Sequence, residues 1–132
     1  MDRRGVAGAL LGAILAGLEP APVASADEAV PVRYGGEVNY DACAGVASVT
    51  RVNPGSALNV RAGPGPGFHV TARLRPDARV ILCDEHDGWQ GIVFAPDRRD
   101  CGTGETVLPR RDYAGPCRSG WVHGSYLRLI AG

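Results

Sequence analysis

Four cysteines and three histidines are the residues of this sequence with the most obvious reactivity. A thiolate beside an imidazole can attack an acyl group, as in cell-wall peptidases. The nucleophile would be Cys83 or Cys101, and the base would be one of the three histidines, His69, His86 and His123. Alternatively, all four cysteines form disulfides and are inert. We favour disulfides, because an even number of cysteines is typical of a small exported domain, and we expect no enzymatic activity.

Metal and serine chemistry have weaker signals in this sequence. The closest two cysteines are sixteen residues apart, so no zinc-type spacing exists. The carboxylates at 84–87 lack the regular ligand spacing of a calcium loop, and a solvated hairpin tip explains them more simply. Ser125 follows His123 by two residues, but it is not in a nucleophile-elbow motif. We therefore expect no metal and no cofactor.

Aromatic side chains give a stronger indication of a site. An aromatic-lined groove with polar flanks recognises extended peptides by stacking and backbone hydrogen bonds. Burial in the core is the alternative for each aromatic residue, and for Trp121 it is the favoured one. By strand parity the polar residues Asn59 and Arg61 face away from the core, where they either contact a ligand carboxylate or brace a loop. The candidate ligand contacts are Asn59, Arg61, Phe68, Trp89, Trp121 and Tyr126.

The stretch 58–68 organises the elements that must position these residues. Its first four residues alternate apolar and polar, which predicts a strand over 58–61 with the apolar pair facing the core. The Gly-Pro-Gly-Pro-Gly run at 63–67 ends this strand, because proline lacks a ladder donor and glycine admits positive φ. We expect a stiff loop there and a second strand over 68–74.

The rest of the chain shows the same short, strand-like patterns. An Asp-Gly pair at 87–88 predicts a tight hairpin turn, because both of its central positions tolerate positive φ. No helical periodicity follows residue 26, so the fold class is all-β, a small barrel or sandwich. The further strands are predicted at 46–52, 79–83, 89–94, 121–122 and 126–130.

The N-terminal part of the sequence differs in composition from the rest. Residues 1–26 begin with a positive start, continue with a short apolar run and end in Ala-Ser-Ala, so we expect a cleaved secretory leader. An exposed N-terminal arm is expected at 27–43, followed by the domain at 44–132.

The chain has a formal net charge of zero, which makes nucleic acid or an anionic membrane a poor partner. We expect a secreted or periplasmic protein that does not insert into a membrane after leader cleavage.

Residues 96–119, here called the insertion, do not fit the strand pattern. They are rich in glycine, proline and arginine, and a structureless loop of this length is uncommon in a compact domain. Four cysteines allow three pairings. We favour Cys101–Cys117, which would close the insertion, and this leaves Cys43–Cys83 to tie the arm to the domain.

Several of these segments, taken in order, resemble the bacterial Src-homology-3 (SH3b) domain family. The matching residues are Leu-Asn-Val-Arg-x-Gly-Pro at 58–64, Phe-x-Val at 68–70, Gly-Trp at 88–89 and Gly-Trp-Val-x-x-x-Tyr-Leu at 120–127. The resemblance covers about residues 46–130 and implies a small, strongly bent SH3-like β-barrel. It also implies a non-catalytic role, in which the domain binds cell-wall peptides or proteins.

Three departures separate this chain from the family pattern. The insertion replaces a short turn, Gly91 stands where the family has a larger residue, and we expect no hydrolase domain beside this one. The expected function is an exported binding module whose partner is a peptidoglycan peptide or an envelope protein. The alternative is a disulfide-stabilised structural or inhibitor-like protein that docks through its insertion. A Cys/His cell-wall hydrolase is the third possibility.

Overall fold

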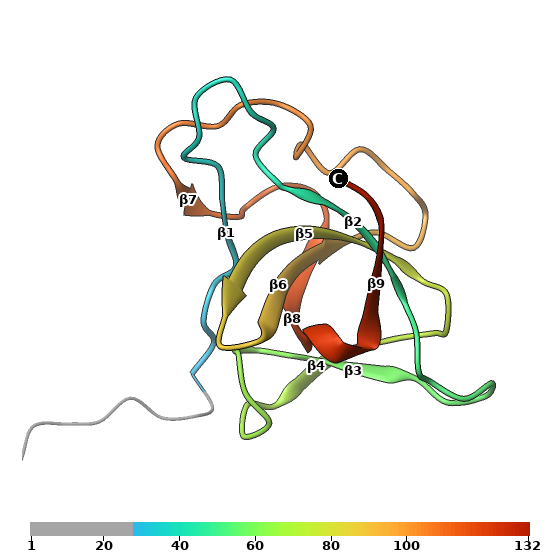
Figure 1. Cartoon of the computed structure of the whole chain (residues 1–132). Coiled ribbons are helices and arrows are strands. Elements are labelled where there is room, and N and C mark those ends of the chain that lie inside the picture. Colours follow the sequence, from blue (N-terminus) through green and yellow to red (C-terminus); the bar gives the residue numbers. More distant parts are fainter. Residues whose placement is uncertain (1–27) are drawn as a thin grey trace, which may run out of the picture.

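The computed structural model describes residues 28–132, and these form an all-β fold (Figure 1). The leader expected at 1–26 lies outside the described residues. No helix in the described part of the chain is long and apolar enough to cross a membrane. The elements in chain order are β1 (Arg33–Tyr34), β2 (Gly45–Val49), β3 (Leu58–Arg61), β4 (Val70–Leu74), β5 (Arg79–His86), β6 (Trp89–Phe94), β7 (Arg111–Asp112), β8 (Arg118–His123), the 3₁₀ turn η1 (Gly124–Tyr126) and β9 (Leu127–Ala131).

Seven of the strands form one antiparallel sheet, in the order β4-β3-β8-β6-β5-β2-β9. The strands β4 and β9 are its two edges and are not paired with each other. Side chains from β2 and from the distant pair β3 and β4 share one hydrophobic core. The sheet is therefore curled, so that its two ends approach each other around this core. The all-β class is therefore confirmed, as a curled sheet that is open between these edges.

Local sequence patterns explain most of the strand boundaries. The predicted strands at 58–61 and 89–94 are confirmed, and Leu58 and Val60 alternate in burial with their polar neighbours. Asp87 and Gly88 adopt φ values of 48° and 83°, as a primed hairpin turn requires. The strand predicted at 46–52 ends earlier, at Val49, because the chain turns at Arg51, which has a φ of 60°.

Other boundaries differ from the predictions. The strand predicted from residue 68 begins at Val70, because Phe68 belongs to the loop and packs against it. The strand predicted at 79–83 continues to His86, because it pairs with β6 along the whole hairpin. Tyr126 lies in η1 and not in the last strand.

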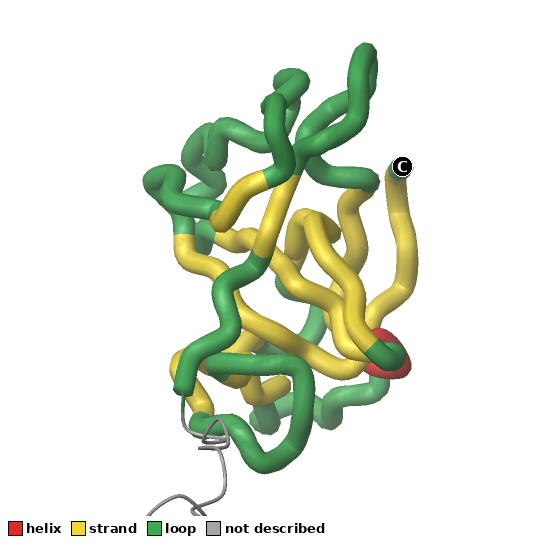
Figure 2. Tube along the Cα trace, turned by 90° about the vertical axis from the view of Figure 1, so that its left-hand side faces the viewer, coloured by secondary structure: helices red, strands yellow, loops and turns green. Residues whose placement is uncertain are grey.

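The arm, which the sequence analysis expected to be exposed, is open to solvent at most of its described residues but is anchored to the sheet at a few buried positions. Val32 is 2% exposed, and the N–H of Val30 donates to the carbonyl of Ala62 at 2.8 Å. Figure 2 shows this segment running along the outside of the sheet. Val32 contacts the position of Gly91, where an added Cβ would lie only 3.1 Å from Cγ1 of Val32. The absence of a side chain at Gly91 therefore makes room for the arm.

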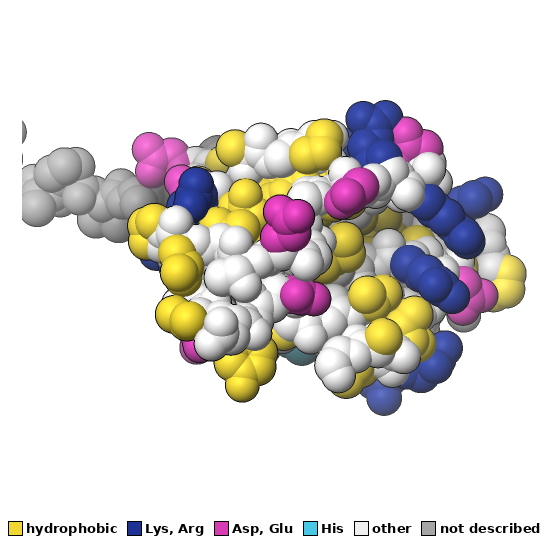
Figure 3. Space-filling model, turned by 90° about the horizontal axis from the view of Figure 1, so that it is seen from above, with side chains coloured by type: hydrophobic (Ala, Val, Ile, Leu, Met, Phe, Trp, Pro, Cys, Tyr) yellow, Lys and Arg dark blue, Asp and Glu magenta, His cyan; other side chains and the backbone are white. Residues whose placement is uncertain are grey.

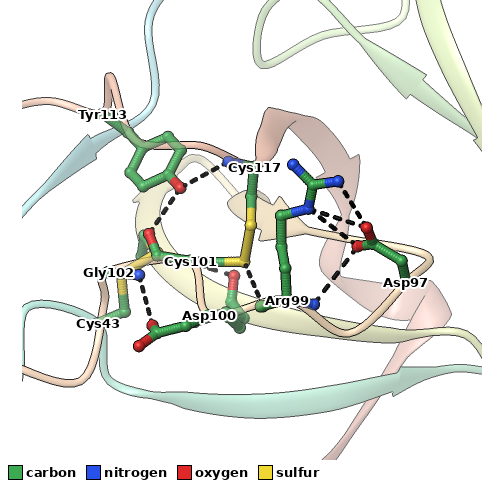
Figure 4. Close-up of a disulfide and its surroundings, with 10 residues drawn as sticks. Cys43, Asp97, Arg99, Asp100, Cys101, Gly102, Tyr113 and Cys117 are labelled. Carbon is green, nitrogen blue, oxygen red and sulfur yellow. Dashed lines mark hydrogen bonds and ion pairs between the residues drawn. A yellow bond between two sulfur atoms is a disulfide. The ribbon is translucent and has the colours of Figure 1, made fainter.

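The insertion folds over the same side of the molecule as the arm. Its strand β7 pairs with β1, a short ribbon that was not predicted. The predicted disulfides are both confirmed, Cys101–Cys117 and Cys43–Cys83. Beside the Cys101–Cys117 disulfide, the Tyr113 hydroxyl donates to the carbonyl of Cys101 at 2.7 Å and accepts from the N–H of Cys117 at 3.1 Å (Figure 4). The insertion is thus a clamped structure and not a free loop.

Candidate functional site

A groove of about 440 Å³ lies on the outer face of the sheet. Four separate segments form it: the turn after β2, strand β3 with the Gly-Pro loop, the start of β6, and the end of β8 with η1. Four of the six predicted ligand contacts line this groove. The lining residues are Arg51, Val52, Asn53, Ser56, Ala57, Leu58, Asn59, Arg61, Pro66, Trp89, His123 and Tyr126.

Trp89 and His123 form one wall of the groove. They are directly opposite each other on β6 and β8, and their rings meet edge to face with centroids 5.5 Å apart. Trp89 is half-buried, so part of its ring is available to a ligand. Tyr126, 38% exposed, reaches the same groove from η1. Such partly exposed aromatics offer a large apolar area at a low cost in conformational entropy.

Asn59 and Arg61 lie on β3 and both line the groove, as strand parity predicted. A guanidinium nitrogen of Arg61 donates to the carbonyl of Phe68 at 2.9 Å, so Arg61 braces the Gly-Pro loop. This bond uses one of the five N–H donors of a guanidinium. Of the two roles that the sequence analysis left open, the structure therefore shows the bracing of the loop, and Arg61 also lines the groove.

Phe68 has a different place from the one expected. Its ring packs beneath the Gly-Pro loop, so closely that a Cβ on Gly63 would lie within 3.0 Å of it. Phe68 is half-buried and does not line the groove, whereas Pro66 of the same loop does. The aromatic residue thus supports the loop, and the proline presents the surface.

Trp121 is a packing residue. It is 2% exposed, and its indole N–H donates to the carbonyl of Val30 at 2.8 Å. The arm covers it, so it is not available to a ligand. This corrects its place among the candidate ligand contacts and agrees with the core burial that was favoured for it.

The lining of the groove carries positive charge. Arg51 and Arg61 contribute two guanidinium groups, and no Asp or Glu lines the groove among the described residues. Sequence reasoning did not place Arg51, Pro66 or His123 in the groove. Two of them had a readable signal: His123 alternates with Trp121 along β8, and Pro66 lies in the stiff loop.

His123 and Ser125 lie close together, with 2.7 Å between Nδ1 and the hydroxyl oxygen. The same nitrogen accepts the backbone N–H of Ser125 at 3.2 Å, so the imidazole caps the first turn of η1. A catalytic triad would also require a carboxylate hydrogen-bonded to the other ring nitrogen. Within the described chain, no carboxylate makes this hydrogen bond. This pair therefore has a structural explanation.

The remaining chemical candidates are engaged elsewhere. All four cysteines are in disulfides, so the thiol of a Cys/His hydrolase is not available. In the hairpin, Asp84 accepts hydrogen bonds from Arg110 at 2.8 Å and from the N–H of Arg33 at 3.0 Å. Within residues 28–132, no group of three or more His, Cys, Asp or Glu side chains gathers as metal ligands do.

Comparison with known proteins gives no relative. No family model matches the chain, and no curated protein and no solved structure matches it.

Proposed function

We propose that this chain is an exported, SH3-like module that binds extended peptides in the groove beside Trp89. The observation that carries the proposal is the convergence of Trp89, Tyr126, Asn59 and Arg61 on one hollow from three different parts of the chain. A shallow groove with aromatic walls and polar flanks suits an extended peptide, whose backbone needs hydrogen-bond partners along its length.

The SH3-like fold has support from the curled antiparallel sheet and from the ordered set of segments that resembles the family. The Leu-Asn-Val-Arg segment forms β3, and the Gly-Trp pairs open β6 and lie within β8. These segments are the ones that build the groove. Two of the departures from the family pattern accommodate the arm: Gly91 leaves room for Val32 on β6, and β7 of the insertion pairs with β1.

The charge of the groove narrows the class of peptide. Two guanidinium groups, with no carboxylate among the described lining residues, favour a ligand that carries carboxylates. Peptidoglycan stem peptides and acidic segments of envelope proteins both meet this requirement. Export is supported by the two disulfides, because such bonds persist in oxidising compartments.

Trp89→Ala is the direct test, measured as binding to purified sacculi and to a soluble envelope extract. Loss of an aromatic anchor costs on the order of 2 kcal/mol or more, so the affinity should fall about 30-fold. Trp89→Phe keeps a ring and should restore most of the binding. Leu108→Ala, which removes a half-exposed apolar side chain of the insertion, should change little.

A second candidate function is docking through the insertion, as an inhibitor docks. The specific observation in its favour is that Leu108 is 50% exposed on a segment clamped by a disulfide. This alternative predicts the opposite ranking, with Leu108→Ala weakening binding more than Trp89→Ala. Circular dichroism of every variant must show the native fold, and unfolding of Trp89→Ala alone would make Trp89 a core residue and contradict our groove.

A further inference from the structure

Two adjoining hollows, of about 980 and 700 Å³, lie outside the candidate groove and share no lining residue with it. The first lies beside the turn of the arm, and the second lies between the β5–β6 hairpin and β9. They meet at Ala44, Cys83 and Arg110, which line both. Together they form one continuous depression, which we call the acidic cleft.

Apolar and aromatic side chains stand open to solvent in the acidic cleft. Tyr40 is 69% exposed in the first hollow, and Leu129 is 62% exposed in the second. Leu82, half-buried, lies in the lining with Leu129. Exposed large apolar groups that line one depression are typical of surfaces that bind another molecule.

The charged groups that line the acidic cleft are mostly carboxylates. Glu37 and Asp41 line the first hollow and Glu85 lines the second, and none of the three has an ion-pair partner among the described residues. Arg110 is the one cation lining either hollow in residues 28–132, and it is already paired with Asp84 at 2.8 Å. Figure 3 looks onto this end of the molecule, where acidic side chains stand among hydrophobic ones in the middle of the face and most arginines lie toward one edge.

We propose that the acidic cleft binds an extended cationic peptide in which Lys or Arg alternates with Leu-sized apolar side chains. A cationic side chain would lie against the ring of Tyr40, between Glu37 and Asp41, where cation–π and ion-pair attraction act together. The neighbouring apolar side chain would cover Leu129. The Arg110–Asp84 pair divides the two subsites and holds the arm to β5, so the cleft is formed before the peptide arrives.

Charge complementarity selects this occupant over a peptide of the opposite sign. The cleft has three unneutralised carboxylates, whereas the groove beside Trp89 has cationic groups and no carboxylate. The two surfaces should therefore take ligands of opposite charge, and the module would connect an acidic partner with a basic one.

The test uses the mature full chain and two labelled synthetic peptides, one of alternating lysine and leucine and one of alternating glutamate and leucine. Fluorescence anisotropy measures their affinities. The double variant Glu37→Gln, Asp41→Asn should weaken the lysine peptide about tenfold, since two ion pairs are lost. Tyr40→Ala should weaken it severalfold. The control pair Glu28→Gln, Asp77→Asn changes the net charge equally at exposed positions outside the cleft, and should have little effect.

Several results would overturn the proposal. An equal loss of affinity in the control double variant would mean that the lysine peptide responds only to the net charge of the protein. Equal binding of the glutamate peptide would show that the carboxylates of the cleft do not select the ligand. Amide chemical shifts should move at Tyr40 and Leu129, and changes confined to Trp89 and His123 would place the peptide in the other groove. Self-association that Tyr40→Ala abolishes, without any peptide binding, would assign the cleft to a second copy of the chain.

Discussion

The indole N–H of Trp121 donates a hydrogen bond of 2.8 Å to the backbone carbonyl of Val30. This bond joins the outer face of β8 to a residue ninety-one positions earlier in the chain. It satisfies the one polar atom of a side chain that is otherwise buried. The arm is thereby part of the folded domain, and Trp121 is withdrawn from the surface that its neighbour His123 helps to form.

Replacing Trp121 should destabilise the fold in two steps. Trp121→Phe keeps most of the apolar burial but loses the hydrogen bond, which should lower the free energy of unfolding by about 1 kcal/mol. Trp121→Ala also leaves a cavity and should cost about 3–5 kcal/mol. Urea denaturation measures both values. A cost below 1 kcal/mol for the alanine variant would show that the arm and Trp121 do not pack together in solution.

Gly91→Ala should destabilise the protein, because the added Cβ would lie 2.7 Å from Cβ of Asp84 and 3.1 Å from Val32. Overpacking of this kind costs about 1–3 kcal/mol. Gly104→Ala is the matched control, because no atom lies within 4 Å of its added Cβ. The melting temperatures of the two variants decide the matter, and equal values would contradict the close packing of the arm on β6.

Removal of the disulfides should affect stability unequally. Cys43 and Cys83 are 40 residues apart, and Cys101 and Cys117 are 16 apart. In the chain-entropy model the first bridge contributes about 4 kcal/mol and the second about 3 kcal/mol. Paired alanine substitutions, compared by urea denaturation, should therefore show the greater loss for Cys43–Cys83. The reverse order would mean that the clamp on the insertion matters more than the link to the arm.

The pKa of Asp97 lies below its usual range, mainly because of the side-chain hydrogen bonds from Arg99, and the pKa of Arg99 is raised in turn. The shortest contact between the two side chains is 2.6 Å (Figure 4). A lowered carboxyl pKa adds stability above the unfolded pKa, and this contribution is lost as the pH falls through the folded value. Both side chains are 55% exposed, so solvent screens the effect.

The test of this pair is therefore a carboxyl titration followed by NMR. Asp97 should titrate below an ordinary aspartate, and Arg99→Ala should return its pKa toward the usual range. Arg75→Ala, which lies outside this pair, should leave the titration unchanged. An identical Asp97 titration in the wild type and in Arg99→Ala would show that the ion pair does not persist in solution.

Local patterns in the sequence were sufficient to predict many of the strands and turns of the sheet. Alternation of apolar and polar residues predicted β3 with its observed bounds, because one face of that strand is buried. The strand β6 was predicted with its observed bounds as the return strand of the hairpin. The Asp-Gly pair predicted the hairpin turn, since few residue pairs accept two positive φ values. The same parity placed Asn59 and Arg61 on the outer face, and both line the groove.

The candidate site was predictable only in part. Trp89 and Tyr126 lie in the groove, but Phe68 supports a loop and Trp121 is covered by the arm. Strand parity gives the face to which a side chain points, and it does not tell whether another segment lies over that face. Arg51 escaped notice because it joins the groove through a turn, where no periodic pattern marks its direction.

The sequence by itself determined the all-β class, the main strands and the groove-facing side of β3, because each depends on residues close together in the chain. The tertiary structure decided which aromatics are exposed. Val32, Gly91 and Trp121 fit together only when the arm lies on β6 and β8, and each of the three is unremarkable in its own segment. Packing between distant segments depends on the shapes of both surfaces at once, so no pattern within one segment can specify it.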